Sequence, residues 1–339
     1  SFPQKNSDGS WLYSTPLISG SYNVANGRHI VYGNGNNYNM DKYNDFANTT
    51  ELKFTPIKQF NITANFTYRN YSTSYTNRQT KFDYRIYPDG PIEYYTSGAG
   101  EDRLDETVKR YNYLSGNIFA TFEETWKDAH HLTVMAGANA ETYYNKNLKA
   151  TGKNLLSETL NDLNLIAPDA TGNVLTEVGG GQNAYSLLGF FGRVNYTYDN
   201  RYMITATLRR DGTSRFQNNK WGLFPSVALG WNIANEGFLK DNDVLTTLKL
   251  RASWGQTGQQ GVGGYYDSQA KYYKNLLGSY YIFGGQIVNP LTALGYNADL
   301  KWETTTTWNV GLDFGFLEDR ITMGLDAYMR ETTDLLNYI

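Results

Sequence analysis

Few residues of this chain are of the types that catalyse reactions or hold metal ions. The 339 residues include no cysteine, which excludes disulfides, thiolate metal sites and cysteine nucleophiles. His130 and His131 lie beside Asp128 in a predicted short turn, and His29 stands alone. No further histidine or carboxylate occurs at the spacing of a metal ligand set, so we interpret these residues as solvated rather than metal-binding.

Two acidic groups are candidates to supply oxygen ligands to Ca²⁺. They are Glu101, Asp102, Asp105 and Glu106, and the turn Asp241, Asn242 and Asp243. Neither group has the spacing of an EF-hand loop, so solvated acids are the better interpretation. The sequence also lacks a G-x-S-x-G motif, a paired catalytic carboxylate and a phosphate-binding glycine loop. We therefore expect no catalytic residue, no metal site and no cofactor, and the chain is not predicted to be an enzyme.

Aromatic residues, by contrast, make up 15% of the chain. Within the segment 256–301, seven of them cluster among Asn, Gln and Gly between positions 265 and 283: Tyr265, Tyr266, Tyr272, Tyr273, Tyr280, Tyr281 and Phe283. Aromatic faces next to amide groups suit sugar rings or peptides, so these seven are the predicted contacts with a substrate or a covering partner. Packing of the segment on itself or against a partner explains them equally well.

The elements that position these residues are predicted to be β-strands. From Trp221 to Ile233 every odd position is apolar, whereas the even positions are mostly small or polar. The same alternation recurs along the chain, and counting strand pairs gives ten strands: about 46–56, 60–71, 111–125, 130–144, 185–199, 201–211, 221–233, 245–256, 302–316 and 320–331. The expected fold is therefore all-β and antiparallel.

Strand length distinguishes a membrane barrel from a soluble sheet. These runs last about 10 to 15 residues, against about 5 or 6 in soluble proteins, and a strand that crosses a bilayer needs about 9 to 11. Trp221 and Trp231 lie ten positions apart on the apolar face, roughly 25 Å along a membrane normal, which matches two aromatic girdles. We expect one face towards lipid and the other towards the lumen. The lipid set is Leu223, Val227, Leu229, Leu248, Leu250, Val310 and Leu312, and the lumen set is Arg193, Arg209, Lys249 and Arg251. The alternative is a soluble or cell-surface β-sandwich adhesin that binds glycans.

Connections of two lengths alternate along the chain. The short ones lie near residues 57–59, 126–129, 200, 234–243 and 317–319. Those that alternate with them span roughly 72–110, 145–184, 212–220 and 256–301, and three of these are far longer than the usual 2 to 5 residues of a hairpin. Outer-membrane barrels have short periplasmic turns and long outer loops, so residues 46–339 are predicted to form barrel wall with long extracellular loops. Residues 1–45 are predicted to be an extracellular loop or irregular segment. Further strands are expected to close the barrel, since open edges in lipid are costly.

Other classes of protein fit the sequence less well. The formal charge is −3, so no basic surface for nucleic acid is expected. No run of 18 or more apolar residues occurs, so no membrane-spanning helix is predicted, and the first ten residues lack the layout of a secretory signal.

Three ordered blocks carry a resemblance to a known family. They are RDGTSRF at 210–216 with WGLFPSV at 221–227 and Gly230-Trp231; LKLRASWGQTG at 248–258; and DLKWET at 299–304 with TTDLL at 332–336. Residues 185–339 thus resemble the SusC/RagA family of TonB-dependent outer-membrane transporters. Residues 1–184 show only a general similarity to that family and contain none of these blocks. The family has a proline at the position of Pro225, which suggests a tolerated bulge in a strand where proline is unusual.

The resemblance implies a 22-stranded barrel, of which this chain supplies about ten strands. It also implies an N-terminal plug, a Ton box that couples import to the TonB complex, and a SusD-like surface lipoprotein. The sequence shows no plug, Ton box or C-terminal strand, so it is expected to be an internal barrel fragment. The expected function is TonB-dependent import of an oligosaccharide or peptide across the bacterial outer membrane. The outer face of the barrel wall is expected to contact lipid.

Overall fold

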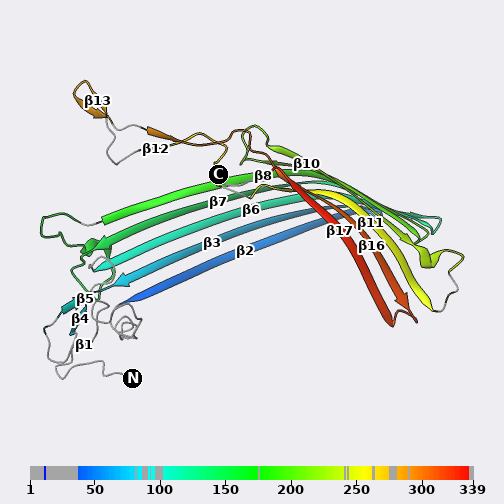
Figure 1. Ribbon diagram of the computed structural model, residues 1–339, viewed down its shortest axis with the longest axis horizontal. Coiled ribbons are helices and arrows are strands. Elements are labelled where there is room, and N and C mark those ends of the chain that lie inside the picture. The colour runs from blue at the N-terminus through cyan, green and yellow to red at the C-terminus, as the bar shows by residue number, and fades with distance from the viewer. Residues whose placement is uncertain are drawn as a thin grey trace. The chain divides into compact units, whose positions relative to one another are not determined.

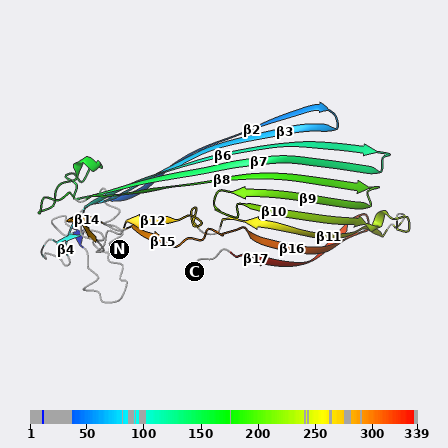
Figure 2. The same cartoon turned by 90° about the horizontal axis from the view of Figure 1, so that it is seen from above.

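A computed structural model describes most of the chain. The described residues are 11–12, 37–80, 82–85, 91, 93–95, 102–174, 176–239, 242, 244–261, 264–274, 281–288 and 291–335. Ten strands form one sheet in the order β17-β16-β11-β10-β9-β8-β7-β6-β3-β2 (Figures 1 and 2). Their bounds are β2 Tyr38–Ile57, β3 Phe60–Gln79, β6 Arg103–Trp126, β7 His130–Lys153, β8 Thr176–Tyr198, β9 Tyr202–Thr213, β10 Trp221–Asn232, β11 Leu245–Gln259, β16 Glu303–Phe316 and β17 Ile321–Thr333. The prediction of ten strands is confirmed. These strands form one sheet and not the two stacked sheets that the sandwich alternative requires.

The smaller elements lie within the connections. They are β1 Trp11–Leu12, β4 Phe82–Arg85, β5 Glu93–Tyr95, β12 Lys271–Lys274, β13 Tyr281–Phe283, β14 Gln286–Val288 and β15 Leu291–Leu294, with two short 3₁₀ helices, Leu163–Leu165 and Ile233–Asn235. No helix among the described residues is long and apolar enough to cross a membrane.

The first strands are longer than predicted. β6 and β7 have 24 residues each, and β2 begins at Tyr38 rather than near residue 46. Apolar alternation ends where a strand leaves apolar surroundings, because neither face then requires apolar side chains. Backbone pairing nevertheless continues into the polar sequence. A pattern of side chains therefore locates the amphipathic part of a strand and misses its polar extension.

The chain divides into two compact units, which we describe separately. Unit 1 comprises Ser1–Phe46, Arg69–Asn112 and Tyr144–Asn183, and unit 2 comprises Ala47–Tyr68, Tyr113–Tyr143 and Ala184–Ile339.

Unit 1 is held by buried polar side chains. The Arg78 guanidinium is buried, donates to the Asp102 carboxylate, and also donates to the backbone oxygen of Ser157 at 3.0 Å. Asp105 is buried as well and accepts from Arg103 at 2.8 Å and from Thr151. The expectation that Asp102 and Asp105 are solvated was wrong. Arginines from β3 and β6 neutralise them, and a buried carboxylate is tolerated when it is paired in this way.

Unit 2 contains the amphipathic parts of the sheet. In the ladder of β10 with its neighbours, Leu229 lies opposite Ile204 and Ala252, and Trp231 lies opposite Tyr202 and Leu250. Lys249 and Arg251 alternate with Leu250 and therefore point to the other face. The segregation of apolar and charged side chains predicted for these strands is confirmed, which gives the sheet one apolar face and one polar face.

Pro225 does not sit in a bulge. The register between β9 and β10 is continuous from Trp221↔Gly212 to Trp231↔Tyr202. The ladder between β10 and β11 begins only at Ser226↔Gly255, so Pro225 stands beyond the end of that ladder. A proline at such a position removes no bond to β11, which explains why the strand accepts it.

Candidate functional site

Residues of the family-like blocks meet in one hydrophobic cluster in unit 2. Phe216, Phe224 and Trp302 are buried, and Trp302 makes edge-to-face contacts with both phenylalanine rings at 5.8 and 5.5 Å between centroids. A Cβ at Gly222 or Gly258 would overlap the Phe224 ring, so these two positions require glycine. The blocks are thus far apart in sequence but form one structural unit, which we call the rim cluster: Phe216, Phe224 and Trp302.

Hydrogen bonds fix the long connection 260–302 at both of its ends. At one end, the Ser268 hydroxyl is fully buried and donates to the Arg215 backbone oxygen at 2.6 Å. At the other end, the Trp302 indole donates to the Lys220 backbone oxygen at 3.0 Å, and Asn218 donates to Asp299 at 2.8 Å. The base of this connection is therefore attached to the segment between β9 and β10.

Aromatic rings attach the same base to the wall. Tyr265 stacks against Tyr143 of β7 and Tyr185 of β8, with 6.1 Å between centroids in each case. The Arg215 guanidinium carbon lies 4.7 Å from the centroids of both Tyr185 and Tyr265. Tyr185 and Tyr143 lie on the polar face by strand parity. Each of these rings has a protein neighbour on at least one side, so the group stabilises the base of the connection.

The seven predicted contact residues divide between this base and a projecting arm. Tyr265 joins the aromatic group, and the Tyr266 hydroxyl accepts a hydrogen bond from the Ala184 backbone at 2.9 Å. Tyr272, Tyr281 and Phe283 are exposed. The side chain of Tyr273 and the whole of Tyr280 lie outside the described residues.

We define the arm as residues 271–294. Its base is the pairing of β12 with β15, from Lys271↔Leu294 to Lys274↔Leu291, and its tip is the hairpin of β13 with β14. Gly284 and Gly285 have φ angles of 57° and 77°, as a two-residue hairpin turn requires. The five apolar side chains of the tip are exposed: Tyr281, Ile282, Phe283, Ile287 and Val288. The arm therefore presents apolar surface that nothing in the described chain covers.

The sequence interpretation missed three residues that hold the base: Tyr143, Tyr185 and Arg215. A usable signal was present, because both tyrosines have the polar-face parity and lie at the ends of the predicted strands 130–144 and 185–199 that border a long connection. No sequence signal paired them with Tyr265, which lies 80 positions after Tyr185 and 122 positions after Tyr143.

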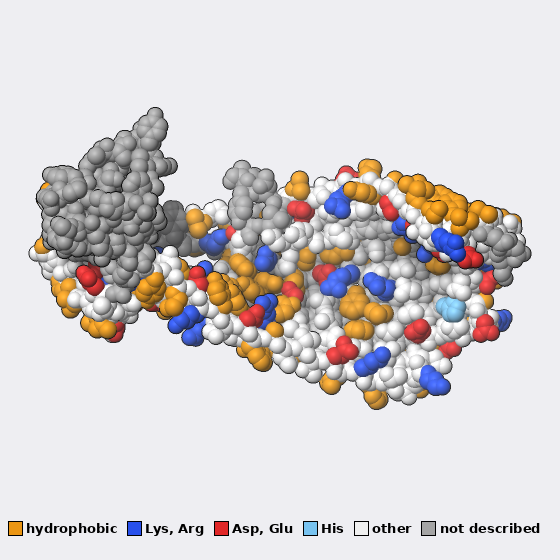
Figure 3. All heavy atoms as spheres, turned by 90° about the horizontal axis from the view of Figure 1, so that it is seen from below, with side chains coloured by type: hydrophobic (Ala, Val, Ile, Leu, Met, Phe, Trp, Pro, Cys, Tyr) orange, Lys and Arg blue, Asp and Glu red, His pale blue; other side chains and the backbone are white. Residues whose placement is uncertain are grey.

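Charged side chains on the polar face form ion pairs within and between strands. Arg251 of β11 donates to both oxygens of Asp313 at 2.7 and 2.8 Å and lies 3.3 Å from Asp326. Arg209 donates to Asp211 and to Asn139, each at 2.6 Å. Figure 3 looks onto a face of the molecule on which basic and acidic side chains lie interspersed. Such a face is compatible with water and unsuited to lipid.

The apolar face carries a row of aromatic rings next to the short turns. Successive ring centroids lie 5.3 Å apart from Trp126 to His130, 4.9 Å to Tyr198, 6.4 Å to Tyr202 and 6.4 Å to Trp231. His130 was expected to be a solvated turn residue, and that interpretation was wrong, because β7 begins at this residue and its ring is held between aromatic neighbours. The row, which we call the lower belt, resembles the aromatic girdle of a membrane interface.

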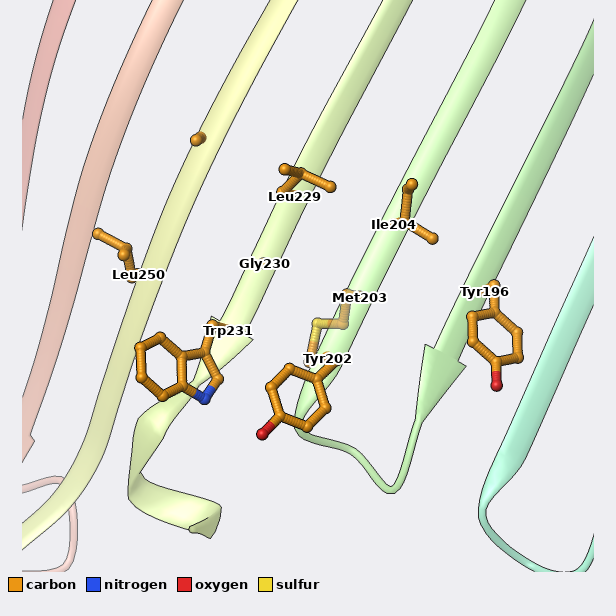
Figure 4. Close-up of a pocket in the computed structure, with 9 residues that line it drawn as sticks. Tyr196, Tyr202, Met203, Ile204, Leu229, Gly230, Trp231 and Leu250 are labelled. Carbon is orange, nitrogen blue, oxygen red and sulfur yellow. The ribbon is translucent and has the colours of Figure 1, made fainter.

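A shallow apolar groove of about 560 Å³ lies beside the lower belt. Figure 4 shows Ile204, Leu229 and Leu250 on adjacent strands, with Tyr202 and Trp231 at the end near the turns. Gly230 and Ala252 supply little side-chain volume, which explains the depression. The lining is mainly apolar and has no set of polar groups that could bind a sugar or peptide. The groove is therefore part of the lipid-compatible face.

Glu236 ties the lower belt to the turn that follows β10. Its carboxylate accepts from the Tyr202 hydroxyl at 2.6 Å, from the Trp231 indole at 2.9 Å and from Arg201 at 3.0 Å. These hydrogen bonds, with that from Tyr202 the largest contribution, hold the pKa of Glu236 below its ordinary value. The carboxylate thus stays charged and keeps the polar atoms of two belt residues directed out of the apolar zone.

Across the described ranges, no three or more His, Asp and Glu side chains are arranged to hold a metal ion. Asp241 and Asp243 lie outside those ranges, whereas the Asn242 side chain between them accepts from the backbones of Val244 and Leu245 at 2.9 Å.

Asp267 organises the base of the long connection and makes it sensitive to acid. Its carboxylate accepts from Lys271 at 2.9 Å and from the Gly264 backbone, while its backbone oxygen accepts from Asn297 at 3.0 Å. The hydrogen bond from Lys271 is the main cause that lowers the pKa of Asp267 below its ordinary value, against burial, which raises it. A lowered pKa in the folded state means that the stabilisation is complete above the unfolded pKa, about 3.9, and is lost as the pH falls through the folded value.

We therefore expect cleavage of residues 264–274 by pepsin to increase as the pH falls from 5 to 2. In Asp267→Asn the same bonds should be cleaved more readily at pH 5, with a weaker dependence on pH because the amide does not titrate. Lys271→Met should move the acid transition to higher pH. Identical pH profiles for all three proteins would show that Asp267 does not hold the base.

Comparisons with known proteins identify relatives of this chain. Residues 2–339 match the family described as TonB dependent receptor-like, beta-barrel. The TonB-dependent receptor SusC of Bacteroides thetaiotaomicron is 51% identical over 163 residues, which cover 47% of this chain and 16% of that protein. The TonB-dependent receptor P39 of Formosa agariphila is 31% identical over 294 residues, which cover 85% of this chain and 26% of that protein.

Solved structures agree with these relatives. The RagAB peptide importer in its 'open-open' state superposes with a TM-score of 0.67 and 26% identity, over 86% of this chain and 30% of the solved chain. The present chain thus spans less than a third of each of these proteins.

Proposed function

The chain belongs to the TonB-dependent receptor β-barrel family of the bacterial outer membrane, and from this premise we propose that it serves the import of a nutrient. The observation that carries the proposal is the two-faced wall. One face is apolar and bordered by an aromatic belt, and the other carries the ion pairs of Arg251 and Arg209. A wall of this kind separates lipid from an aqueous lumen through which a polar solute can pass.

We propose that residues 46–339 form wall and long extracellular loops, that β2 extends this wall back to Tyr38, and that the residues before Tyr38 belong to the extracellular side. The lengths of the connections favour this orientation. On one side, the connections after β2, β6, β8 and β16 have two to four residues and that after β10 has 12. On the other side, the connections after β3, β7 and β11 have 22 or more residues and that after β9 has seven, as expected for outer loops.

The proposed substrate is an oligosaccharide or a peptide. The relative RagAB is a peptide transporter, and the exposed Tyr272, Tyr281 and Phe283 of the arm provide ring faces of the kind that bind both classes of solute. The lumen contains both charges, so it does not favour a strongly anionic or cationic solute.

The proposed partners follow from the family and from the arm. A SusD-like surface lipoprotein would cover the outer mouth and contact the apolar tip, and the TonB complex would supply energy through an N-terminal plug region. The aliphatic side chains of the tip, Ile282, Ile287 and Val288, are better suited to a protein surface than to a sugar. We therefore propose that the tip contacts the lipoprotein rather than the substrate.

Removal of the arm tests this proposal. Because Lys271 lies directly opposite Leu294, residues 272–293 can be replaced by a short glycine linker without moving the base. In the full-length transporter we expect uptake of the nutrient or retention of the lipoprotein to fall by about tenfold, the change that follows from losing roughly 1.4 kcal/mol of binding free energy. The barrel should stay folded, since loops outside the bilayer contribute little to its hydrogen-bonded wall.

A second variant separates surface chemistry from loop length. Tyr281→Ser with Phe283→Ser keeps the arm and removes two exposed rings, so it should reproduce part of the defect. Surface amount and heat-modifiable migration in electrophoresis serve as controls for folding. Normal uptake together with normal lipoprotein binding by the arm deletion, at wild-type surface amounts, would remove the arm from the proposed site.

A further inference from the structure

Two consecutive arginines of β9 face opposite sides of the wall. Arg209 points to the polar face, where Asp211 and Asn139 accept its hydrogen bonds at 2.6 Å. Arg210 has the opposite parity and lies across from Phe190 of β8 and Leu223 of β10. Both of these neighbours are exposed on the apolar face. Arg210 is therefore a cation on the surface that contacts lipid.

The guanidinium of Arg210 is held by an aromatic ring. Its central carbon lies 5.0 Å from the ring centroid of Trp221, and Trp221 in turn stacks on Phe190 at 6.2 Å. None of the Asp and Glu side chains that the structure describes forms an ion pair with Arg210, in contrast to Arg209, Arg201 and Arg251. The positive charge is thus positioned but not neutralised within the described chain.

The depth of Arg210 explains how lipid tolerates it. Trp221 lies ten residues from Trp231 of the lower belt, roughly 25 Å along the normal, so it marks the opposite interface, next to the connection 214–220. An arginine is strongly destabilising at the bilayer midplane but nearly neutral close to an interface. The contact with Trp221 places the Arg210 guanidinium at the level of the lipid headgroups.

We propose that Arg210 and Trp221 form a binding site for the phosphate of a phosphorylated glycolipid of the outer leaflet. The planar guanidinium donates in pairs to phosphate oxygens, which makes arginine well suited to this group. Phe190, Leu223 and Leu208, all exposed on the same face, provide a surface for an acyl chain below the phosphate. Free phosphate has no apolar group that could contact that surface, whereas a lipid has acyl chains that do. The lipid is therefore the favoured ligand.

This inference rests on the proposed orientation, which is tested independently. A single cysteine at Asn219 in the full-length protein should react with a membrane-impermeant maleimide on whole cells, because Asn219 lies in the connection next to Trp221. Lack of reaction, with reaction only after cell lysis, would reject the orientation without reference to lipid binding.

The lipid site is tested with the full-length protein in nanodiscs. The probes are lipid A with two phosphates, lipid A with one phosphate, and lipid A stripped of both, each measured by native mass spectrometry. For phosphorylated lipid A we expect Arg210→Gln to lower retention at least about tenfold, because the substitution removes the charge-assisted hydrogen bonds to the phosphate. Arg210→Lys should retain part of the binding, since it keeps the charge and loses the paired geometry.

Arg193→Gln is the matched control. Arg193 lies on the polar face, where it donates to Thr207 at 3.2 Å, and its loss should leave lipid retention unchanged. Equal retention of phosphorylated lipid A by Arg210→Gln and wild type would overturn the proposal. So would equal retention of the lipid stripped of phosphate by the wild type, or displacement of lipid A by millimolar inorganic phosphate alone.

Discussion

Replacing Trp302 by alanine should lower the free energy of unfolding of the full-length barrel by about 3 to 5 kcal/mol, the range for removing a large buried aromatic side chain. Trp302 is 8% exposed and contacts both other members of the rim cluster. Its indole also fixes the connection 214–220 through the Lys220 backbone. The cavity left by the substitution cannot be filled easily, because Phe224 is confined between Gly222 and Gly258.

The same substitution should release the base of the long connection. We expect residues 295–302 to become accessible to protease while the strands remain protected. Trp302→Phe provides the comparison, since it keeps a ring in the cluster but loses the indole hydrogen bond, which contributes about 1 kcal/mol. Unfolding in denaturant, followed by heat-modifiable migration, gives the free energies. A loss below about 1 kcal/mol for Trp302→Ala would show that the rim cluster does not stabilise the wall.

The second large effect is expected from a charge on the apolar face. Val227 lies between Ala206 and Trp254 on that face, near the middle of β10. An arginine there should destabilise the barrel by roughly 2 to 4 kcal/mol, the cost of a guanidinium near the bilayer midplane. Its neighbour Ala228 points to the polar face between Thr205 and Ser253, so Ala228→Arg should cost much less.

The pair Val227→Arg and Ala228→Arg makes a self-controlled comparison, because the two sites differ by one residue and share one strand. Both proteins are measured after refolding into the same lipid vesicles. Equal destabilisation by the two variants, or a larger effect at Ala228, would contradict the assignment of faces.

The regular part of the wall could be predicted from the sequence because its cause is local. Alternation along Trp221–Ile233 determines which residues share a face, and the pairing of Leu229 with Ile204 and Ala252 follows once neighbouring strands are aligned. The polar extensions of β6 and β7 were missed because their backbone pairing carries no apolar pattern. Arg78 and Asp102 were missed for a related reason, since their contact joins polar segments with no periodic signal.

The site was predictable only in part. The tyrosines of 256–301 singled out this connection, but the sequence did not show that Tyr265 and Tyr266 hold its base while Tyr281 and Phe283 stand at an exposed tip. That division depends on contacts with Tyr143, Tyr185 and Arg215, which come from three other parts of the chain. Family-like blocks showed that Phe216, Phe224 and Trp302 matter together, and the structure gives the reason, which is direct packing.

The assignment of one face to lipid and the other to the lumen is the central claim, and spin labelling along β10 tests it most directly. This chain has no cysteine of its own, so single cysteines can be placed at each position from Leu223 to Leu229 of the full-length protein in vesicles, provided that any cysteine elsewhere is replaced. We expect collisions with oxygen, which concentrates in lipid, to peak at Leu223, Pro225, Val227 and Leu229, and collisions with a water-soluble nickel chelate to peak at the positions between. A profile without this period of two, or with the two reagents exchanged, would contradict the account.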